Sequence, residues 1–249
     1  MDKRVHILGV SIDNYTKQEL IEAIDNLVRI GKPSHIVGVN VDQVLHTHKF
    51  EIARKIFNEA AIVFTDGKPI IWMSKILGNK ILERTTGPDL MDDLCALAAR
   101  KRYRIFLLGA AEGVAAKAAI ILKEKYPDIY IAGTYSPPMG FQNNTSEIEK
   151  INSMLRNSNS DMLFVGMGSP KQDIFIYQNM NKYQVPVSFS MGAAIDFIAG
   201  NIRRAPRWMI DCGLEWFYRV LQDPRRLWKR YFIYSWKIIP IFISSLLKK

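Results

Sequence analysis

The feature that most limits the fold of this chain is the alternation of short β-branched runs with amphipathic helical stretches. Strands that are joined through helices form mostly parallel sheets with helices on both faces. The sequence therefore predicts an α/β fold with a Rossmann-like sheet. The expected strands are Val5–Val10, Ile36–Val39, Ala61–Thr65, Arg104–Gly109, Ile129–Ala132, Met162–Gly166 and Val187–Met191, and the expected helices are Thr16–Ile30, Asp89–Arg100, Val114–Tyr126 and Glu147–Arg156. Thr16 and Glu19 form a capping box at the first helix, and Gly31 is a natural stop.

The last 49 residues have a different character. From Asn201 onward there are eleven Lys/Arg against three Asp/Glu, together with four of the five tryptophans, whereas the whole chain of 249 residues carries a net charge of +10. A basic, aromatic and aliphatic segment is typical of proteins that settle on an anionic membrane surface. We expect helices over Ala205–Gln222 and Asp223–Ile239, with an interruption at Pro240. Residues 1–196 are the expected catalytic core, and 197–249 the expected helical, membrane-targeting appendage.

Other features narrow the class of protein. Cys95 and Cys212 are far apart and without metal-ligand spacing, which argues against a disulfide framework or a zinc site. The first apolar run is too short for a signal-peptide core. No stretch reaches the ~18 uninterrupted apolar residues of a spanning helix. The sequence thus predicts a peripheral, monotopic protein at the cytoplasmic face of the membrane.

Polar and glycine-rich turns follow several of the expected strands, where ligands bind in open α/β sheets. Glycine lets backbone N–H groups approach a phosphate at a helix N-terminus, so these turns favour a nucleotide or sugar-nucleotide. They contain no dinucleotide fingerprint and no Walker loop. Ordinary tight turns are the alternative. The candidate substrate-binding residues at these turns are Gly109, Gly113, Gly166, Gly168, Lys171, Gln172, Gly192 and Asp196.

Asp66 is the sharpest single candidate. A carboxylate directly after a buried strand can accept a proton from a hydroxyl group. The alternative is that Asp66 caps a helix that begins near Lys68. No second carboxylate stands at a telling spacing, and His35, His46 and His48 lack the acidic or cysteine neighbours of a metal site.

The cations of the appendage fit a diphosphate on either a nucleotide or a lipid, because guanidinium groups bind phosphate oxygens in pairs. The alternative is a solvated helix face, which the neighbouring tryptophans argue against. The residues concerned are Arg203, Arg204, Arg207, Arg219, Arg225, Arg226, Lys229 and Arg230, with Trp208, Trp216, Trp228 and Trp236.

Taken in order, these motifs resemble the TagA/WecG/CpsF family of bacterial glycosyltransferases over nearly the whole chain. The resemblance rests on Asn40, Thr65-Asp66-Gly67-Lys68-Pro69 with Trp72, Glu83-Arg84-Thr85-Thr86-Gly87-Pro88-Asp89-Leu90, Phe106-Leu107-Leu108-Gly109, Gly166-Met167-Gly168-Ser169-Pro170-Lys171-Gln172, Gly192-Ala193-Ala194-Ile195-Asp196-Phe197, Arg204-Ala205-Pro206-Arg207-Trp208, Gly213-Leu214-Glu215-Trp216 and Arg230-Tyr231. Within the family, the chain is most similar to the enzymes of wall teichoic acid linkage-unit synthesis.

The resemblance implies a reaction. N-acetylmannosamine would pass from its UDP donor to the 4-hydroxyl of N-acetylglucosamine on undecaprenyl diphosphate, with inversion to a β-1,4 link and without a metal or other cofactor. Asp66 corresponds to the family's general base, Asn40 to a second catalytic position, and Arg84 and the appendage arginines are candidates to neutralise the leaving diphosphate. Gly38 departs from the pattern, because family members often carry threonine there.

Three other interpretations stay open at this stage. A basic, aromatic tail also suits a nucleic-acid-binding protein, although aliphatic residues such as Ile241 and Phe242 fit lipid better, so we expect no nucleic-acid partner. A membrane scaffold without an active site is the second. A family member that uses another UDP-sugar for another surface polysaccharide is the third. A homo-oligomer is compatible with the sequence, which does not define the oligomeric state.

Overall fold

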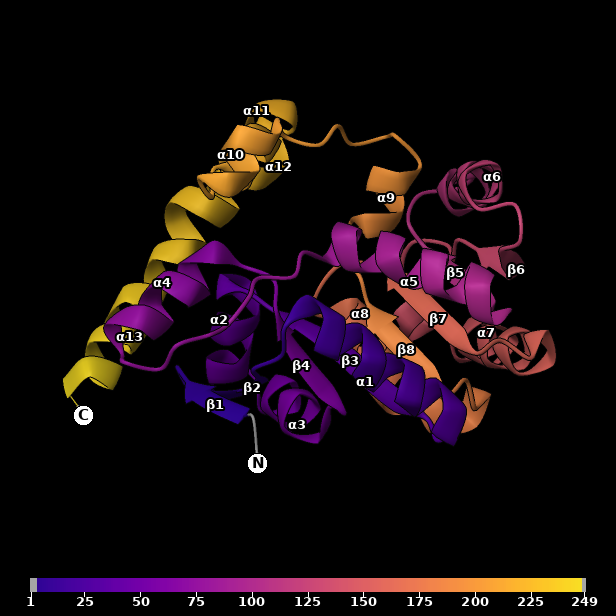
Figure 1. Ribbon diagram of the computed structural model, residues 1–249, viewed down its shortest axis with the longest axis horizontal. Coiled ribbons are helices and arrows are strands. Elements are labelled where there is room, and N and C mark those ends of the chain that lie inside the picture. The colour runs from indigo at the N-terminus through magenta and orange to yellow at the C-terminus, as the bar shows by residue number, and fades with distance from the viewer. Residues whose placement is uncertain (1–3, 248–249) are drawn as a thin grey trace.

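The computed structural model describes residues 4–247, apart from the side chain of Asp211. Its centre is a six-stranded sheet in the order β4-β3-β8-β7-β5-β6, in which every pair of neighbours is parallel. The α/β prediction is confirmed (Figure 1). The strands are β3 (Ser34–Val39), β4 (Ile62–Thr65), β5 (Arg104–Gly109), β6 (Tyr130–Tyr135), β7 (Met162–Gly166) and β8 (Val187–Ser190).

Helices cover both faces of the sheet because successive strand residues point to opposite sides. On β3, Ile36 packs in the cluster of one face and Val37 in that of the other. On β5, Leu107 and Leu108 divide in the same way. One face carries α1 (Lys17–Ile30), α5 (Gly87–Lys101), α6 (Val114–Lys125) and α9 (Ala194–Ile198); the other carries α2 (Val41–Lys49), α3 (Glu51–Glu59), α4 (Lys68–Ile76), α7 (Thr145–Ser158) and α8 (Lys171–Tyr183).

The chain begins with a hairpin rather than a strand of the main sheet. β1 (Arg4–Ile7) and β2 (Val10–Asp13) pair antiparallel in a separate two-stranded sheet, so the predicted strand Val5–Val10 is wrong. The reason is the turn at Leu8 and Gly9, both of which have positive φ, inside an otherwise apolar run. Asp13 then joins the hairpin to the sheet edge, because its Oδ2 accepts from the backbone N–H of Val63 at 2.8 Å. The predicted capping box of α1 and its stop at Gly31 are confirmed.

The C-terminal segment is helical, with more breaks than the sequence predicts. Its elements are α10 (Arg207–Asp211), α11 (Glu215–Gln222), α12 (Pro224–Lys229), a π-helical turn (Arg230–Tyr234), a 3-10 turn (Ser235–Lys237) and α13 (Ile238–Leu247). The single helix expected over Ala205–Gln222 is wrong, because Gly213, at φ 76°, separates α10 from α11. Pro240 does not interrupt the chain's helical path. It lies in the first turn of α13, directly after the change from π to 3-10 winding.

This segment packs against the core instead of extending from it. Ile238 joins Val39, Val44 and Ile70 in one apolar cluster, and Leu227 is buried as well. Arg230 forms an ion pair with Asp42 at the start of α2. Figure 1 shows the segment in yellow beside α4 and α2. Within residues 4–247, no helix is both long enough and apolar enough to cross a membrane.

Candidate active site

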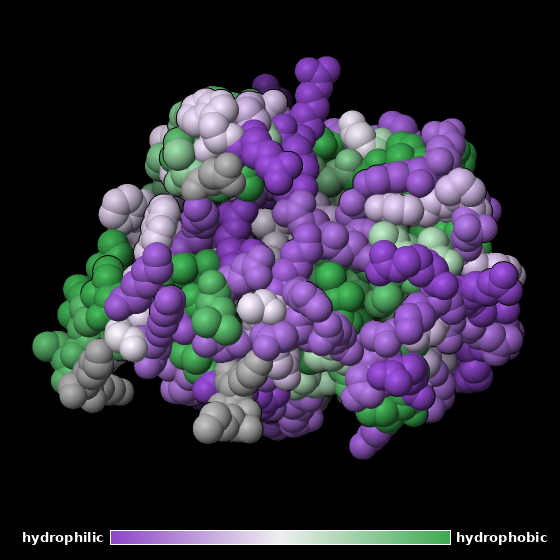
Figure 2. All heavy atoms as spheres, viewed as in Figure 1, coloured by the Kyte–Doolittle hydropathy of each residue, from purple (hydrophilic) through white to green (hydrophobic). Residues whose placement is uncertain are grey.

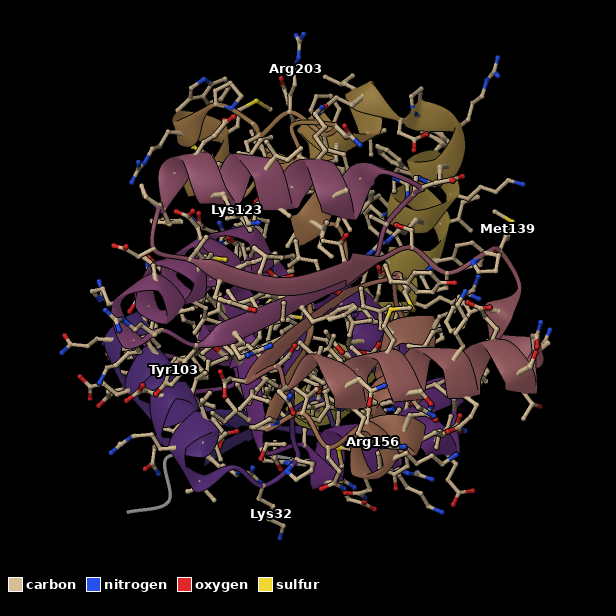
Figure 3. All side chains as sticks on the ribbon, turned by 90° about the vertical axis from the view of Figure 1, so that its right-hand side faces the viewer. Lys32, Tyr103, Lys123, Met139, Arg156 and Arg203 are labelled. Carbon is tan, nitrogen blue, oxygen red and sulfur yellow. The ribbon has the colours of Figure 1, made fainter. Side chains whose placement is uncertain are left out.

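A cavity of about 1600 Å³ lies at the carboxyl ends of the sheet strands, between the core and the C-terminal segment. Core residues line one side of it, and residues of α11, α12 and the turns before α13 line the other. The loop after β6 forms part of its rim, where the side chain of Met139 is fully exposed (Figure 3). Several predicted residues meet here: Asn40, Asp66, Arg84, Gly109, Gly166, Gly168, Lys171, Gln172, Gly192 and Asp196 all line the cavity, whereas Gly113 does not and instead forms the N-cap of α6.

Asp66 stands at the end of β4, held by backbone on both sides. Its N–H donates to the carbonyl of Val39 at 3.0 Å, and its Oδ1 accepts from the N–H of Gly87 at 3.2 Å. The Asn40 side chain also bonds the Asp66 carboxylate, while the Asn40 Oδ1 caps α2 through the N–H of Asp42 at 3.0 Å. The alternative that Asp66 caps α4 is wrong, because the N-cap is Gly67 and the helix has no side-chain cap hydrogen bond.

The surroundings of Asp66 favour a carboxyl that holds its proton more tightly than usual. Burial raises the pKa of Asp66, and this effect outweighs the hydrogen bonds and the charges of Arg84 and Arg219, which act to lower it. A base with a raised pKa is better matched to proton transfer near neutral pH. The carboxylate can therefore take a proton from a hydroxyl group placed in the cavity.

The structure brings a second carboxylate to this site, from α11. Glu215 lines the cavity, and its Oε2 lies 3.9 Å from Nη2 of Arg84. Burial raises the pKa of Glu215, and the charge of Asp66 raises it further. The sequence showed no second carboxylate at a telling spacing from Asp66, because Glu215 reaches the site only through the fold. The only signal for Glu215 in the sequence was the motif Gly213–Trp216. This motif is far from Asp66 along the chain, so the sequence does not show that both residues line one cavity.

The appendage cations divide into two groups. Arg219, Arg226 and Arg230 line the cavity, as do Trp216 and Trp236. Arg219 and Arg226 act on Asp196, whose pKa burial raises and these two charges lower. The remaining predicted residues lie outside the cavity lining: Arg203, Arg204, Arg207, Arg225, Lys229, Trp208 and Trp228.

Arg204 and Arg203 illustrate why position along the segment decides the role. The Arg204 guanidinium pairs with Asp89 in the first turn of α5, with Nη2 3.0 Å from Oδ2, and also donates to the Thr86 hydroxyl at 3.2 Å. Arg204 thus fastens the start of the C-terminal segment to the core. Arg203 points away from the molecule, as Figure 3 shows.

The glycine turns of the cavity floor pack backbone against backbone. A Cβ on Gly109 would lie 2.7 Å from the carbonyl oxygen of Gly166, and one on Gly166 would lie 3.0 Å from that of Gly192. Oε1 of Gln172 accepts from the N–H of Gly192 at 3.0 Å, which joins the turns after β7 and β8. Only glycine fits these approaches, which keep the turns at the strand ends close together along the cavity floor.

A buried polar chain supports the same two turns from behind. The Asp173 carboxylate bonds the hydroxyls of Ser169 and Ser190. Nε2 of His35 lies 2.9 Å from the Ser190 hydroxyl, and Nδ1 of His46 lies 3.3 Å from that of Ser169. Burial lowers the pKa of His35 to about 3, so this ring is neutral. These histidines serve as hydrogen-bonding groups, and residues 4–247 hold no cluster of three His, Cys, Asp or Glu side chains arranged for a metal ion.

Sequence reasoning missed other parts of the cavity. Trp72 of α4 lines it beside Gly213, whose added Cβ would meet the indole at 3.2 Å. The loop after β6 also lines it, over residues 136–142. Trp72 belongs to a motif that was recognised but given no role. The loop's only local signal was its Pro-Pro-Met-Gly composition, which indicates a turn and no chemistry.

Comparison with known proteins agrees with this arrangement. The profile of the glycosyl transferase WecG/TagA/CpsF family matches residues 5–249. The chain belongs to this family. A relative from Bacillus subtilis (strain 168), N-acetylglucosaminyldiphosphoundecaprenol N-acetyl-beta-D-mannosaminyltransferase, is 32% identical over 87% of this chain and 83% of its own length. A protein of the same name from Staphylococcus aureus (strain MW2) is 30% identical over 98% of this chain and 92% of its own length.

Proposed function

We propose that this family member transfers N-acetylmannosamine from UDP-N-acetylmannosamine to the 4-hydroxyl of N-acetylglucosamine on undecaprenyl diphosphate, as a step of wall teichoic acid linkage-unit synthesis. The names of the relatives supply the transferred sugar, the lipid-linked acceptor and the β linkage. The observation that carries the proposal is the position of Asp66, a carboxylate with a raised pKa on the wall of a cavity that also holds arginines.

The proposed reaction is a single displacement. The acceptor 4-hydroxyl gives its proton to Asp66 while its oxygen forms a bond to the anomeric carbon. The bond from that carbon to the β-phosphate oxygen breaks, and its electron pair leaves with UDP. Attack from the side opposite UDP converts an α-linked donor into a β-linked product. Asn40 holds the Asp66 carboxylate in place through its hydrogen bond.

Charge on the departing diphosphate must be neutralised, and the cavity offers cations for this purpose. Arg84 comes from the core, and Arg219, Arg226 and Arg230 come from the C-terminal segment. Fixed guanidinium groups in a partly dry cavity stabilise a developing diphosphate better than solvent does. Our proposal therefore includes turnover without a divalent cation, which an excess of chelator tests directly. The glycine turns at Gly109, Gly166 and Gly192 are the proposed donor phosphate and sugar contacts.

The location follows from the acceptor. A lipid diphosphate is confined to the bilayer, so the enzyme acts at the membrane surface, and we propose its cytoplasmic face, where UDP-sugars are made. Residues 1–196 form the proposed catalytic core. Residues 197–249 form the proposed appendage. Its described part, up to Leu247, then has two tasks, because its inner side lines the cavity and its outer side is apolar and basic.

The test is release of UDP from UDP-N-acetylmannosamine, with and without a diphosphate-linked N-acetylglucosamine acceptor on a short, water-soluble lipid. We expect acceptor-dependent release that falls about 100-fold or more in Asp66→Asn, in line with the loss of a general base. Asp128→Asn is the matched control, because Asp128 is exposed and outside the cavity lining.

Three outcomes would contradict parts of the proposal. Equal turnover of Asp66→Asn and wild type would remove Asp66 as the base. An α-linked product, read from the anomeric carbon–proton coupling, would exclude single displacement. Turnover with another UDP-sugar and none with UDP-N-acetylmannosamine would change the donor while keeping the family reaction.

A further inference from the structure

Exposed apolar side chains are concentrated in two segments that are far apart in the sequence. Of the 20 large apolar residues that are exposed in the described chain, twelve lie between Trp208 and Leu247, and three lie between Trp72 and Leu82. The second group belongs to α4 and the loop after it, which are parts of the core. Single exposed apolar residues are ordinary, whereas a contiguous patch marks a contact surface.

α4 and α13 contribute to one apolar cluster. Met73 of α4 and Leu77, directly after it, share this cluster with Ile238 of α13. In the view of Figure 1, α4 and α13 overlap near the end marked C. Trp72 and Ile239 both line the cavity, so the seam between the helices begins at the cavity mouth.

The outer residues continue this seam away from the cavity. One turn beyond Trp72, Ile76 is 61% exposed, and one turn beyond Ile239, Ile243 is 49% exposed. Figure 2 shows the apolar atoms gathered at this end of the molecule. We define the α4–α13 face as the exposed apolar residues of the two segments at this seam: Trp72, Ile76, Leu82, Ile239, Ile243, Leu246 and Leu247.

The two segments that carry this face contain only positive charges. Residues 68–82 contain three lysines and no Asp or Glu, and residues 224–247 contain five Lys/Arg and no Asp or Glu. Arg226 and Arg230 line the cavity, which leaves Arg225, Lys229 and Lys237 as the cations of the second segment outside it. A second copy of this chain docked through the same face would bring these cations together, because a two-fold interface places like residues opposite one another. An anionic lipid surface instead attracts them and also receives the apolar side chains.

We propose that the α4–α13 face docks on an anionic bilayer, so that helix α4 of the core enters the interface together with the C-terminal segment. The cavity mouth between Trp72 and Ile239 then opens directly onto the lipid. A lipid-diphosphate acceptor can reach Asp66 along this seam without leaving the bilayer. This last consequence rests on the proposed function, whereas the docking itself does not.

The test compares two isoleucines of equal exposure. Ile76 on α4 and Ile30 at the end of α1 are both 61% exposed, and neither lines the cavity. The full chain, as wild type, Ile76→Ser or Ile30→Ser, is sedimented with vesicles of phosphatidylcholine and phosphatidylglycerol, and with vesicles of phosphatidylcholine alone. We expect Ile76→Ser to weaken partitioning onto the anionic vesicles roughly five- to tenfold, because an apolar side chain no longer enters the interface, and Ile30→Ser to match wild type.

Other results would overturn the proposal. If Ile76→Ser and Ile30→Ser both bind like wild type, α4 is not part of the docking face. If wild type binds the neutral vesicles as tightly as the anionic ones, the charge argument fails. If sedimentation equilibrium shows a dimer that Ile76→Ser alone dissociates, with vesicle binding unchanged, the face belongs to a second copy.

The same samples keep docking and function apart. Turnover with the water-soluble acceptor is measured for each variant, and it should equal wild type for Ile76→Ser, because Ile76 does not line the cavity. If the wild type shows no turnover although it binds vesicles, the proposed function is refuted and the docking face still holds.

Discussion

Gly38 and Phe64 form a matched pair, and replacing Gly38 by threonine tests this reasoning. The two residues are opposite each other in the parallel register of β3 and β4. A Cβ on Gly38 would lie 2.8 Å from Cζ of Phe64 and 3.4 Å from Cβ of Asp66. The Phe64 ring therefore occupies the space that a threonine at position 38 would fill.

The free energy of unfolding should record this conflict. Forcing extra atoms against a buried ring costs about 1–3 kcal/mol. Removing glycine from a strand returns about 0.5–1 kcal/mol, so Gly38→Thr should lose roughly 0–2.5 kcal/mol. Phe64→Leu alone leaves a partly filled gap and should lose about 1–2 kcal/mol. Together the two changes relieve the clash, so the double variant should lose about 1–2 kcal/mol less than the sum of the single variants.

Urea unfolding of wild type, the two single variants and the double variant, monitored by circular dichroism, measures this coupling as a double-mutant cycle. The reasoning is refuted if the effects of the two changes add without coupling. The cycle also has a functional readout. In the double variant, the new hydroxyl stands beside Asp66 and can donate to it, which would lower the pKa of Asp66 and move the acid limb of kcat/KM to lower pH.

Three further predictions concern Glu215 in the cavity wall, Ile238 where the C-terminal segment packs on the core, and Asp173 behind the glycine turns. Glu215→Gln removes a like charge from Asp66 and frees nearby arginines, so the acid limb of kcat/KM should move to lower pH in a pH–rate profile. Ile238→Ala removes a buried side chain that holds the C-terminal segment on the core, so it should lower the free energy of unfolding by about 2–4 kcal/mol. Amide hydrogen exchange over residues 224–247 should become faster. Burial raises the pKa of Asp173, so the native state binds its proton more tightly than the unfolded chain and wild-type stability falls as pH rises through the raised pKa. Asp173→Asn should lack this slope in urea unfolding and should raise KM for the UDP-sugar more than it lowers kcat.

The central sheet could be predicted from sequence because its signals are local. Buried parallel strands are short β-branched runs, and the rule that sites form at their carboxyl ends places Asp66 and the glycine turns together from the sequence alone. The hairpin was missed because its turn at Leu8 and Gly9 lies inside an apolar run that reads as one strand. Helices α2 and α3 were also missed, since they abut at Phe50 and neither is long enough to show a clear period.

The tail side of the cavity could not be predicted, for a different reason. Which arginines line it depends on how the segment docks, and docking depends on a few buried contacts such as Leu227 and Ile238. Amino-acid composition does not distinguish the role of Arg204 from that of Arg219. The structure separates them, because Asp89 pairs with Arg204 whereas Arg219 lies in the cavity wall. Glu215 was overlooked for the same reason, since its proximity to Asp66 exists only after docking.

Docking of the tail also bears on the strength of the base. Burial is the main cause of the raised pKa of Asp66, and the cavity around it is closed on one side by the tail residues Trp216 and Tyr231. If the tail were to leave the core, water would reach Asp66 and weaken the largest cause of its raised pKa, although the loss of the Arg219 charge would oppose part of the fall in pKa. Asp66 would then become a weaker base. The same departure would remove Arg219, and with it charge stabilisation for the leaving group. Under the proposed mechanism, a core without its docked tail therefore has a weaker base and less charge stabilisation for the leaving UDP, even with every core residue in place.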